Sequence, residues 1–423
     1  MPLQIDVLPQ ELFDLIFEDL VALERGETPR KASLLASSLV SKAWAQHTFR
    51  HRFRSLVLYV PCEHARSTEE VRDIHTLLGQ EGFLGMMLSV CDLELRFGTR
   101  GKPANITADL HHFVSHFPRL QSLHLVGYIR QGPSPPVHVA TIPHMQRLKI
   151  TVCPHEVAGV FSPDLCDALS QFSTIGELHV VDLWGWVREP DAPRFDISHV
   201  SLPRVTSLVV EQSRLGALVH VMRRVATERM RTLDLISDCH RLHRALELPE
   251  SLPHPPEHLF VLASCWDLGA DDADRALHTE RITRVLGKRI TIVMCIGSEK
   301  LCMRHAHPRT RSIWARLEFF LSVAEATARL EYVEVVLAPT AFGPEVLTLS
   351  VVSDMLAEDD TLIRRCEDIL LRMTRAERLG SVYVRICSAP PGPYKVMRES
   401  FLPESKITEG LFPRLHNLHL LRS

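Results

Sequence analysis

The residues best suited to hold a metal ion lie at 302–307, in the segment "CMRHAH". Cys302, His305 and His307 offer one thiol and two imidazoles, which are groups that zinc prefers. A tetrahedral zinc site needs a fourth ligand, and the neighbouring sequence offers none. We therefore interpret the segment as a polar loop with ordinary histidines and expect no metal there.

Two charged clusters could bind ions or nucleic acid. The acidic cluster at 271–274 ("DDAD") lacks the fixed spacing of ligands in a calcium loop, so we expect a solvated helix start there. The basic cluster at 50–54 ("RHRFR") has no interleaved aromatic residues beyond Phe49 and Phe53, which belong to a helical core pattern. We interpret it as an exposed helix face and not as a nucleic-acid site.

Common catalytic motifs are absent from the chain. It contains no G-x-S-x-G, no G-x-x-x-x-G-K-[ST], no G-x-G-x-x-G and no H-E-x-x-H. The net charge is −3, from 48 basic and 51 acidic residues, so neither nucleic acid nor an anionic membrane is expected as a partner. We predict a protein that is not an enzyme, with no catalytic residue and no cofactor.

The cysteines and the hydropathy indicate the compartment. No two of the 10 cysteines are closer than Cys295 and Cys302, so no C-x-x-C pair occurs. The N-terminus lacks a basic segment followed by an apolar run, and no apolar stretch is long enough to cross a bilayer. We therefore expect a cytoplasmic or nuclear protein with reduced cysteines.

A short phrase recurs from residue 56 onward and predicts a strand in each copy. A Pro or polar residue precedes an apolar position, two polar positions and a strand of the form L-x-L. Full copies occupy 117–127, 142–152, 202–212 and 412–422. Weaker copies occupy 173–183, 228–238, 328–338 and 377–387, and an opening copy without the Pro occupies 89–97.

The first leucine of each strand measures the repeat. These residues, which we call the ruler residues, are separated by 30, 25, 30, 30 and 25 positions: Leu93, Leu123, Leu148, Leu178, Leu208 and Leu233. A period of this size, with helix-like stretches between strands, predicts an α/β solenoid with parallel strands. The alternative is an irregular α/β domain whose strands share an L-x-L core pattern.

The repeat becomes less regular beyond residue 250. The spacings from Ile290 to Val333 and from Val333 to Val382 are 43 and 49, and helices are expected at about 309–328 and 359–378. The segments 249–258 and 389–394 have the composition of loops. We therefore divide this part of the chain into an array at 59–250 and either an irregular continuation or a C-terminal cap at 251–423.

Trp184 and Trp186 form a candidate binding site for a substrate protein. They lie in the segment 182–195, directly after an expected strand. Large aromatic side chains on loops are frequent anchors of protein interfaces. They can also cover the end of a hydrophobic array, and the sequence favours neither interpretation.

Residues 1–55 follow a helical pattern and predict three short helices. In the first helix, Leu12, Leu15, Ile16 and Leu20 form one apolar stripe, and a second stripe runs beside it. Three helices of this length make a core that is too small to stand alone. We therefore expect a partner, or the first repeat, to cover the second apolar stripe.

This N-terminal segment resembles an F-box over residues 8–58. The resemblance consists of an ordered set of features: Leu8-Pro9, Glu11-Leu12, Ile16-Phe17, "SLVSKAW" at 38–44 and "FRSLVL" at 53–58. The polar insertion at 24–31 departs from the family pattern. An F-box followed by leucine-rich-type repeats also resembles a known arrangement, although no copy here contains the full asparagine-containing repeat signature.

The resemblance implies a three-helix F-box domain at 1–58 that docks on a Skp-family adaptor and, through it, on a cullin. The docking residues that it implies are Leu8, Pro9, Leu12, Ile16, Leu39, Val40 and Trp44. The repeats would then hold an unidentified substrate protein for ubiquitin transfer. The alternatives are a scaffold that binds the adaptor without promoting ubiquitin transfer and, in another class, an α/β enzyme with an undetected site.

Overall fold

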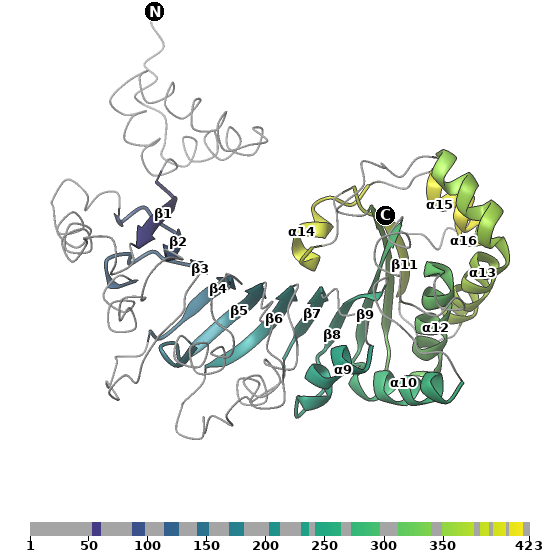
Figure 1. Ribbon diagram of the computed structural model, residues 1–423, viewed down its shortest axis with the longest axis horizontal. Coiled ribbons are helices and arrows are strands. Elements are labelled where there is room, and N and C mark those ends of the chain that lie inside the picture. The colour runs from purple at the N-terminus through teal and green to yellow at the C-terminus, as the bar shows by residue number, and fades with distance from the viewer. Residues whose placement is uncertain are drawn as a thin grey trace, which may run out of the picture. The chain divides into compact units, whose positions relative to one another are not determined.

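The computed structural model describes fourteen stretches of the chain (Figure 1). They are residues 53–60, 87–97, 114–126, 142–151, 169–181, 203–211, 230–236, 242–263, 272–296, 312–339, 349–375, 381–388, 392–402 and 406–417. Contacts divide the chain into two compact units, one formed by 1–156 with 171–173 and the other by 157–170 with 174–423.

The first unit contains a sheet of parallel strands that pair in chain order. The described strands are β1 (Ser55–Val60), β2 (Asp92–Phe97), β3 (Ser122–Val126) and β4 (Met145–Thr151). Strand β1 includes Ser55–Leu58, which the sequence placed at the end of the F-box-like segment. These residues are therefore the first strand of the sheet.

The second unit continues the same pattern, again with parallel pairs in chain order. Its described strands are β5 (Thr174–Val181), β6 (Arg204–Glu211), β7 (Thr232–Ile236), β8 (His258–Leu262), β9 (Arg289–Ile296), β10 (Tyr332–Pro339) and β11 (Ser381–Ile386). The expected parallel strands are confirmed in both units, and with the helices of the second unit the expected α/β class is confirmed.

The ruler residues explain the register of the strands. Leu93 pairs with Leu123 and Leu123 with Leu148, while in the second unit Leu178 pairs with Leu208. All ruler residues are buried, because each presents its side chain to the apolar side of the sheet. The repeating leucine therefore sets both the pairing and the buried face.

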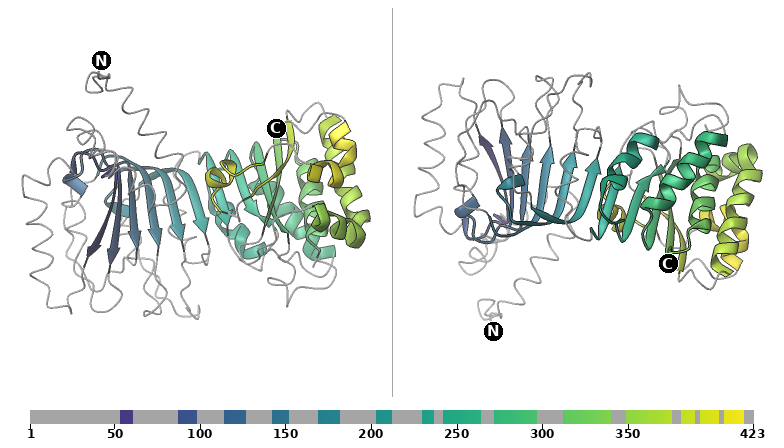
Figure 2. Two further views of the ribbon diagram at one scale, coloured as in Figure 1. Left: turned by 90° about the horizontal axis from the view of Figure 1, so that it is seen from above. Right: turned by 90° about the horizontal axis from the view of Figure 1, so that it is seen from below.

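Helices cover one side of the strands in the second unit (Figures 1 and 2). They are α9 (Leu242–Ser251), α10 (Asp272–Val285), α12 (Ile313–Ala326) and α13 (Leu349–Arg375). Helix α12 packs on β9, and α13 packs on α12 and β11. The long helices expected from the stretched spacings are confirmed, with α13 beginning ten residues earlier than expected.

A serine joins α12 and α13 at the kink of the longer helix. The Ser312 hydroxyl accepts the backbone N–H of Trp314 at the start of α12 (3.2 Å) and donates to Asp359 Oδ2 (2.6 Å). Asp359 has non-helical backbone angles, φ −135° and ψ 26°, inside α13. The N-cap of one helix is thus bonded to the kink of the next.

The C-terminal region contains three short helices, α14 (Tyr394–Arg398), α15 (Lys406–Leu411) and α16 (Pro413–Asn417). The strand expected from the repeat phrase at 412–422 falls on 418–420, which lie outside the described residues, and the residues before it form α16. The buried Glu367 carboxylate accepts the N–H groups of Arg414 (2.6 Å) and Leu415 (3.3 Å). This cap stabilises the helix.

The segment expected to be a loop at 249–258 is only partly a loop. Pro249 and Glu250 belong to the last turn of α9, and His258 begins β8. A proline is tolerated there because the helix ends two residues later, so little of its hydrogen-bond ladder is lost. Among the described residues, no helix combines the length and the apolar composition that crossing a bilayer requires.

Candidate functional site

The residue after each ruler residue points to the other side of the sheet, which we call the polar face. In the first unit these residues are Glu94, His124 and Lys149. In the second unit they are His179, Val209 and Asp234, followed by Phe260, Thr291, Glu334 and Tyr383 after the register partners that continue the ruler positions on β8 to β11. Helix α14 lies on this face of the second unit, opposite α9 and α10 (Figures 1 and 2).

Glu334 on β10 is the centre of a buried hydrogen-bond cluster. Its side chain has no exposed surface. The carboxylate accepts hydrogen bonds from Thr291 Oγ1 (3.0 Å), Arg385 Nε (2.7 Å) and the Tyr394 hydroxyl (2.8 Å). Three donors, one of them charged, offset the free-energy cost of burying the carboxylate.

Asp234 on β7 also contacts Tyr394, the first residue of α14. Its Oδ2 accepts the backbone N–H of Tyr394 at 3.1 Å. Burial raises the pKa of this carboxyl to about 7, the hydrogen bond from Tyr394 opposes that rise, and the charge of Glu177 adds to it. Asp234 therefore titrates near neutral pH, far above an ordinary aspartate.

His258 on β8 completes the cluster as a neutral imidazole. Burial, together with the charge of Arg289, lowers its pKa to about 4. Its Nε2 lies 2.9 Å from Thr291 Oγ1. Because the Thr291 hydroxyl gives its proton to Glu334, the His258 Nε2–H is the donor in this contact. His258 therefore donates a hydrogen bond to Thr291, and Thr291 donates one to Glu334.

The cluster anchors the segment 392–402 to the polar face. The Tyr394 ring packs on His258 (5.2 Å between centroids) and Phe260 (5.6 Å), and Met397 is fully buried. The Leu402 N–H donates to the Ile386 carbonyl (2.8 Å) beside the edge strand β11. The polar groups of the cluster are bonded to one another. We therefore infer that the cluster holds the segment 392–402 on the polar face and does not itself bind a ligand.

A second group of side chains on the polar face places two tyrosines between two arginines, and we call it the Arg–Tyr row. It consists of Arg289, Tyr332, Tyr383 and Arg385 on β9 to β11. Arg289 Cζ lies 5.1 Å from the Tyr332 ring centroid, the two tyrosine rings are 5.3 Å apart, and Arg385 Cζ lies 5.0 Å from the Tyr383 ring. The row is a continuous stack of cations and rings.

Histidine–glutamate contacts occupy the polar face in both units. In the first unit His124 Nδ1 lies 3.2 Å from Glu94 Oε2, and its Nε2 lies 2.8 Å from Thr151 Oγ1. In the second unit His179 Nε2 lies 2.9 Å from Glu211 Oε2. Polar pairing across neighbouring strands is therefore a general property of this face.

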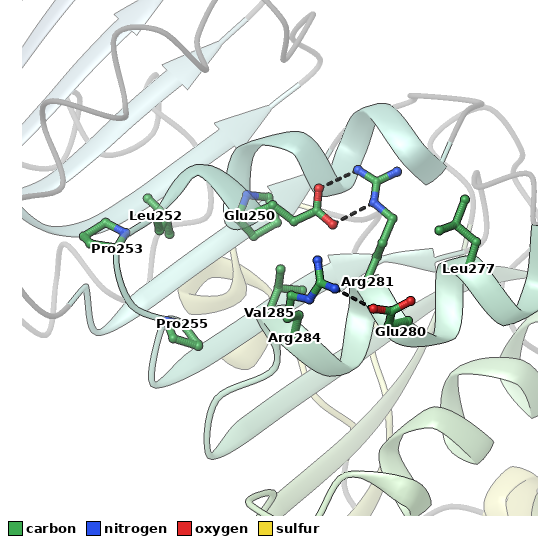
Figure 3. Close-up of a pocket in the computed structure, with 10 residues that line it drawn as sticks. Glu250, Leu252, Pro253, Pro255, Leu277, Glu280, Arg281, Arg284 and Val285 are labelled. Carbon is green, nitrogen blue, oxygen red and sulfur yellow. Dashed lines mark hydrogen bonds and ion pairs between the residues drawn. The ribbon is translucent and has the colours of Figure 1, made fainter.

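A pocket of about 490 Å³ lies between α9 and α10, on the side of the helices (Figure 3). Glu250 and Arg281 point toward each other from the two helices and form two hydrogen bonds of 2.6 Å. Arg284 pairs with Glu280 on α10. Because these charged side chains are paired with one another, they are less suited to bind a ligand. The polar face is therefore the stronger candidate site.

The sequence-predicted site residues all lie outside the described residues. These are the expected adaptor-binding residues Leu8, Pro9, Leu12, Ile16, Leu39, Val40 and Trp44 and the expected substrate-binding residues Trp184 and Trp186. The segment 302–307 also lies outside them. The expected helix start at 271–274 is confirmed, since α10 begins at Asp272.

The Arg–Tyr row and the Glu334 cluster were missed by the sequence analysis. A signal for part of them was present, because Asp234, Thr291 and Glu334 each follow a ruler position inside an apolar strand. A polar residue at an alternating position of such a strand indicates a specific partner. Tyr394 had no such signal, since it lies in a segment with the composition of a loop. No family model matches the chain, and no curated protein matches it significantly.

Proposed function

We propose that this chain is the substrate-recognition subunit of a Skp–cullin–F-box ubiquitin ligase. The observation that carries the proposal is the ordered F-box-like set of residues at 8–58, whose last residues form the first of the parallel strands. Leu8, Pro9, Leu12, Ile16, Leu39, Val40 and Trp44 would contact the Skp-family adaptor. The chain would act in the cytoplasm or nucleus.

The parallel sheets support the proposal by offering a rigid binding surface. Strands hold side chains at fixed positions, and the second unit carries charged and aromatic residues side by side on its polar face. Such residues are enriched among those that dominate protein interfaces. The substrate would be bound there while the F-box holds the ligase.

The mechanism that follows is catalysis by proximity, without a catalytic residue of this chain. Binding of the adaptor and of the substrate by one molecule raises the effective concentration of a substrate lysine at the ubiquitin-transfer module. The chain would need to orient the substrate but would not transfer protons or form a covalent intermediate.

A pull-down with a purified Skp-family adaptor tests the proposal. We expect the wild-type chain to bind and a Leu8→Ala, Pro9→Ala double variant to lose at least tenfold in affinity, because large apolar anchors dominate such interfaces. An Arg284→Ala variant, altered at an exposed ion pair of α10, serves as the control and should bind like wild type. Absence of binding by the wild type would refute the proposal.

The alternative function is a scaffold that uses the F-box for assembly without promoting ubiquitin transfer. It shares the adaptor interaction and differs in whether a cullin joins the complex. Adding purified cullin to the adaptor pull-down separates the two. A ternary complex favours the ligase subunit, and adaptor binding that excludes cullin favours the scaffold.

A further inference from the structure

We propose that the Arg–Tyr row and the adjoining helix α14 bind an acidic segment of a partner protein, with Arg289 receiving a carboxylate. The row is defined by register as well as by contact, since Arg289 and Tyr332 are paired positions of β9 and β10. The identification of this partner as the ligase substrate rests on the proposed function, whereas the binding of an acidic segment does not.

Arg289 is the charge on which the proposal depends. Its side chain is exposed, and within the described part of the chain no carboxylate lies within ion-pair distance of it. Its chain neighbour Lys288 is paired with Glu331 (2.9 Å), so these two flanking charges neutralise each other. Arg385, at the other end of the row, is held by the buried Glu334. One guanidinium of the row therefore remains for a ligand.

The two ring side chains beside Arg289, those of His258 and Tyr332, are neutral at neutral pH. The His258 imidazole is uncharged, because burial and Arg289 lower its pKa to about 4. Burial and the Glu334 charge raise the pKa of Tyr332 to about 12, so its hydroxyl is also uncharged. A ligand carboxylate would therefore meet a single cation that an aromatic ring holds in place.

Helix α14 extends this surface with more positive charge and with apolar area. Lys395 and Arg398 are exposed, as is Val396 at 54% of its surface, and the exposed acidic residue beside them is Glu399. Tyr394 links the helix to the row through Glu334, because the Glu334 carboxylate accepts hydrogen bonds from both the Tyr394 hydroxyl and Arg385 of the row. The combined surface is basic and partly apolar.

This composition fits an acidic protein segment. The planar guanidinium can bind a carboxylate through two parallel hydrogen bonds, and tyrosine and arginine are the residues most enriched at binding hot spots. The tyrosine rings and Val396 offer contact area for apolar residues between the acids. Complementary charge would also direct the approach of the partner.

The test begins with selection of a phage-displayed library of random dodecapeptides on the purified full chain. We expect enrichment of Asp and Glu. The most enriched peptide, labelled with fluorescein, is then measured by fluorescence anisotropy. We expect Arg289→Glu to weaken binding of this peptide at least tenfold. We expect Arg289→Lys to give an intermediate loss, since lysine keeps the positive charge but lacks the planar guanidinium that binds a carboxylate through two hydrogen bonds.

Arg284→Glu is the matched control, because it makes the same charge change on the opposite side of the strands, at an exposed residue of α10. It should bind within about twofold of wild type, as expected for a charge outside the interface. Circular dichroism confirms that each variant is folded. The proposal is overturned if acidic residues are not enriched, if Arg289→Glu binds like wild type, or if both charge reversals weaken binding equally.

Failure of this proposal and failure of the proposed function are distinguishable. The adaptor pull-down probes residues 8–58, and the peptide measurement probes β9 to β11 and α14. Adaptor binding without acidic-peptide binding leaves the ligase role standing and moves the substrate site elsewhere. Acidic-peptide binding without adaptor binding leaves an interaction surface whose partner is not a ligase substrate.

Discussion

At the scale of single residues, two buried acids on the polar face differ in their hydrogen-bond partners. Glu334 accepts three hydrogen bonds, one of them from the charged Arg385. Asp234 accepts one backbone N–H and has no cationic partner among the described residues. Burial therefore favours the protonated form of Asp234 near neutral pH.

We expect Glu334→Gln to destabilise the second unit by about 3 kcal/mol, because the change leaves the partly buried Arg385 without its carboxylate. Native-state hydrogen exchange of the β10 amides measures this free energy. Glu318→Gln is the control, since Glu318 pairs with an exposed Arg365 at 3.7 Å. The control should change stability by no more than about 0.5 kcal/mol. Equal effects of the two substitutions would contradict the role of Glu334 as the centre of the cluster.

Asp234 should make stability decrease as pH rises from about 4 to about 7. Its pKa is 3.8 ordinarily and about 7 in the fold, so across this window the folded chain holds a proton that the unfolded chain has lost. Above about pH 7 both states are ionised and the loss is complete. Asp234→Asn cannot titrate but keeps an oxygen for the Tyr394 N–H.

We therefore expect the variant to gain stability relative to wild type across that window, by at most about 4 kcal/mol. Urea denaturation at a series of pH values measures the difference. His258 has a lowered pKa and contributes the opposite slope, which is present in both proteins and cancels in the difference. A stability difference that does not change with pH would contradict the assignment.

At the scale of elements, ion pairs between neighbouring helices hold the repeats together on the side away from the polar face. Arg281 of α10 bonds to Glu250 of α9, and Arg372 of α13 bonds to Glu325 of α12. The first pair is largely buried and the second is more exposed. Both pairs are bidentate, so the greater burial of the α9–α10 pair makes it the stronger of the two.

We expect Arg281→Leu to lower the unfolding free energy by about 2 kcal/mol, because it removes two charge-assisted hydrogen bonds and leaves Glu250 unpaired in a partly closed pocket. Thermal denaturation measures the effect. Arg284→Leu alters the neighbouring exposed pair and should change stability by no more than about 0.5 kcal/mol. If Arg281→Leu and Arg284→Leu have the same melting temperature, the Arg281–Glu250 pair does not stabilise the contact between α9 and α10.

At the scale of the whole molecule, the chain combines an N-terminal segment for which we propose a docking role with two units of parallel strands, the second of which also contains helices between its strands. In a repeat array each copy contacts its neighbours, so binding surfaces form from many strands at once. The adaptor pull-down uses the full chain, because it measures whether this molecule binds a Skp-family adaptor. The charge-reversal test asks whether the same molecule also binds an acidic partner.

The sequence by itself predicted the parallel strands and the positions of their leading leucines, because the period-two alternation of a strand and the burial of one face are local properties that repetition makes visible. The structure adds that these residues are register partners, and so are Val333 and Val382, 49 residues apart. The helix at 413–417 was missed because a buried carboxylate from α13 stabilises it.

Only the tertiary structure decided which polar residues meet on the polar face. Asp234 and Tyr394 are 160 residues apart, and no local pattern relates them. The pKa of Asp234, the neutral state of His258 and the free charge of Arg289 all depend on which groups the fold brings near and which it removes from water. Sequence periodicity identifies the side of a strand, but burial and long-range contacts determine the chemistry on it.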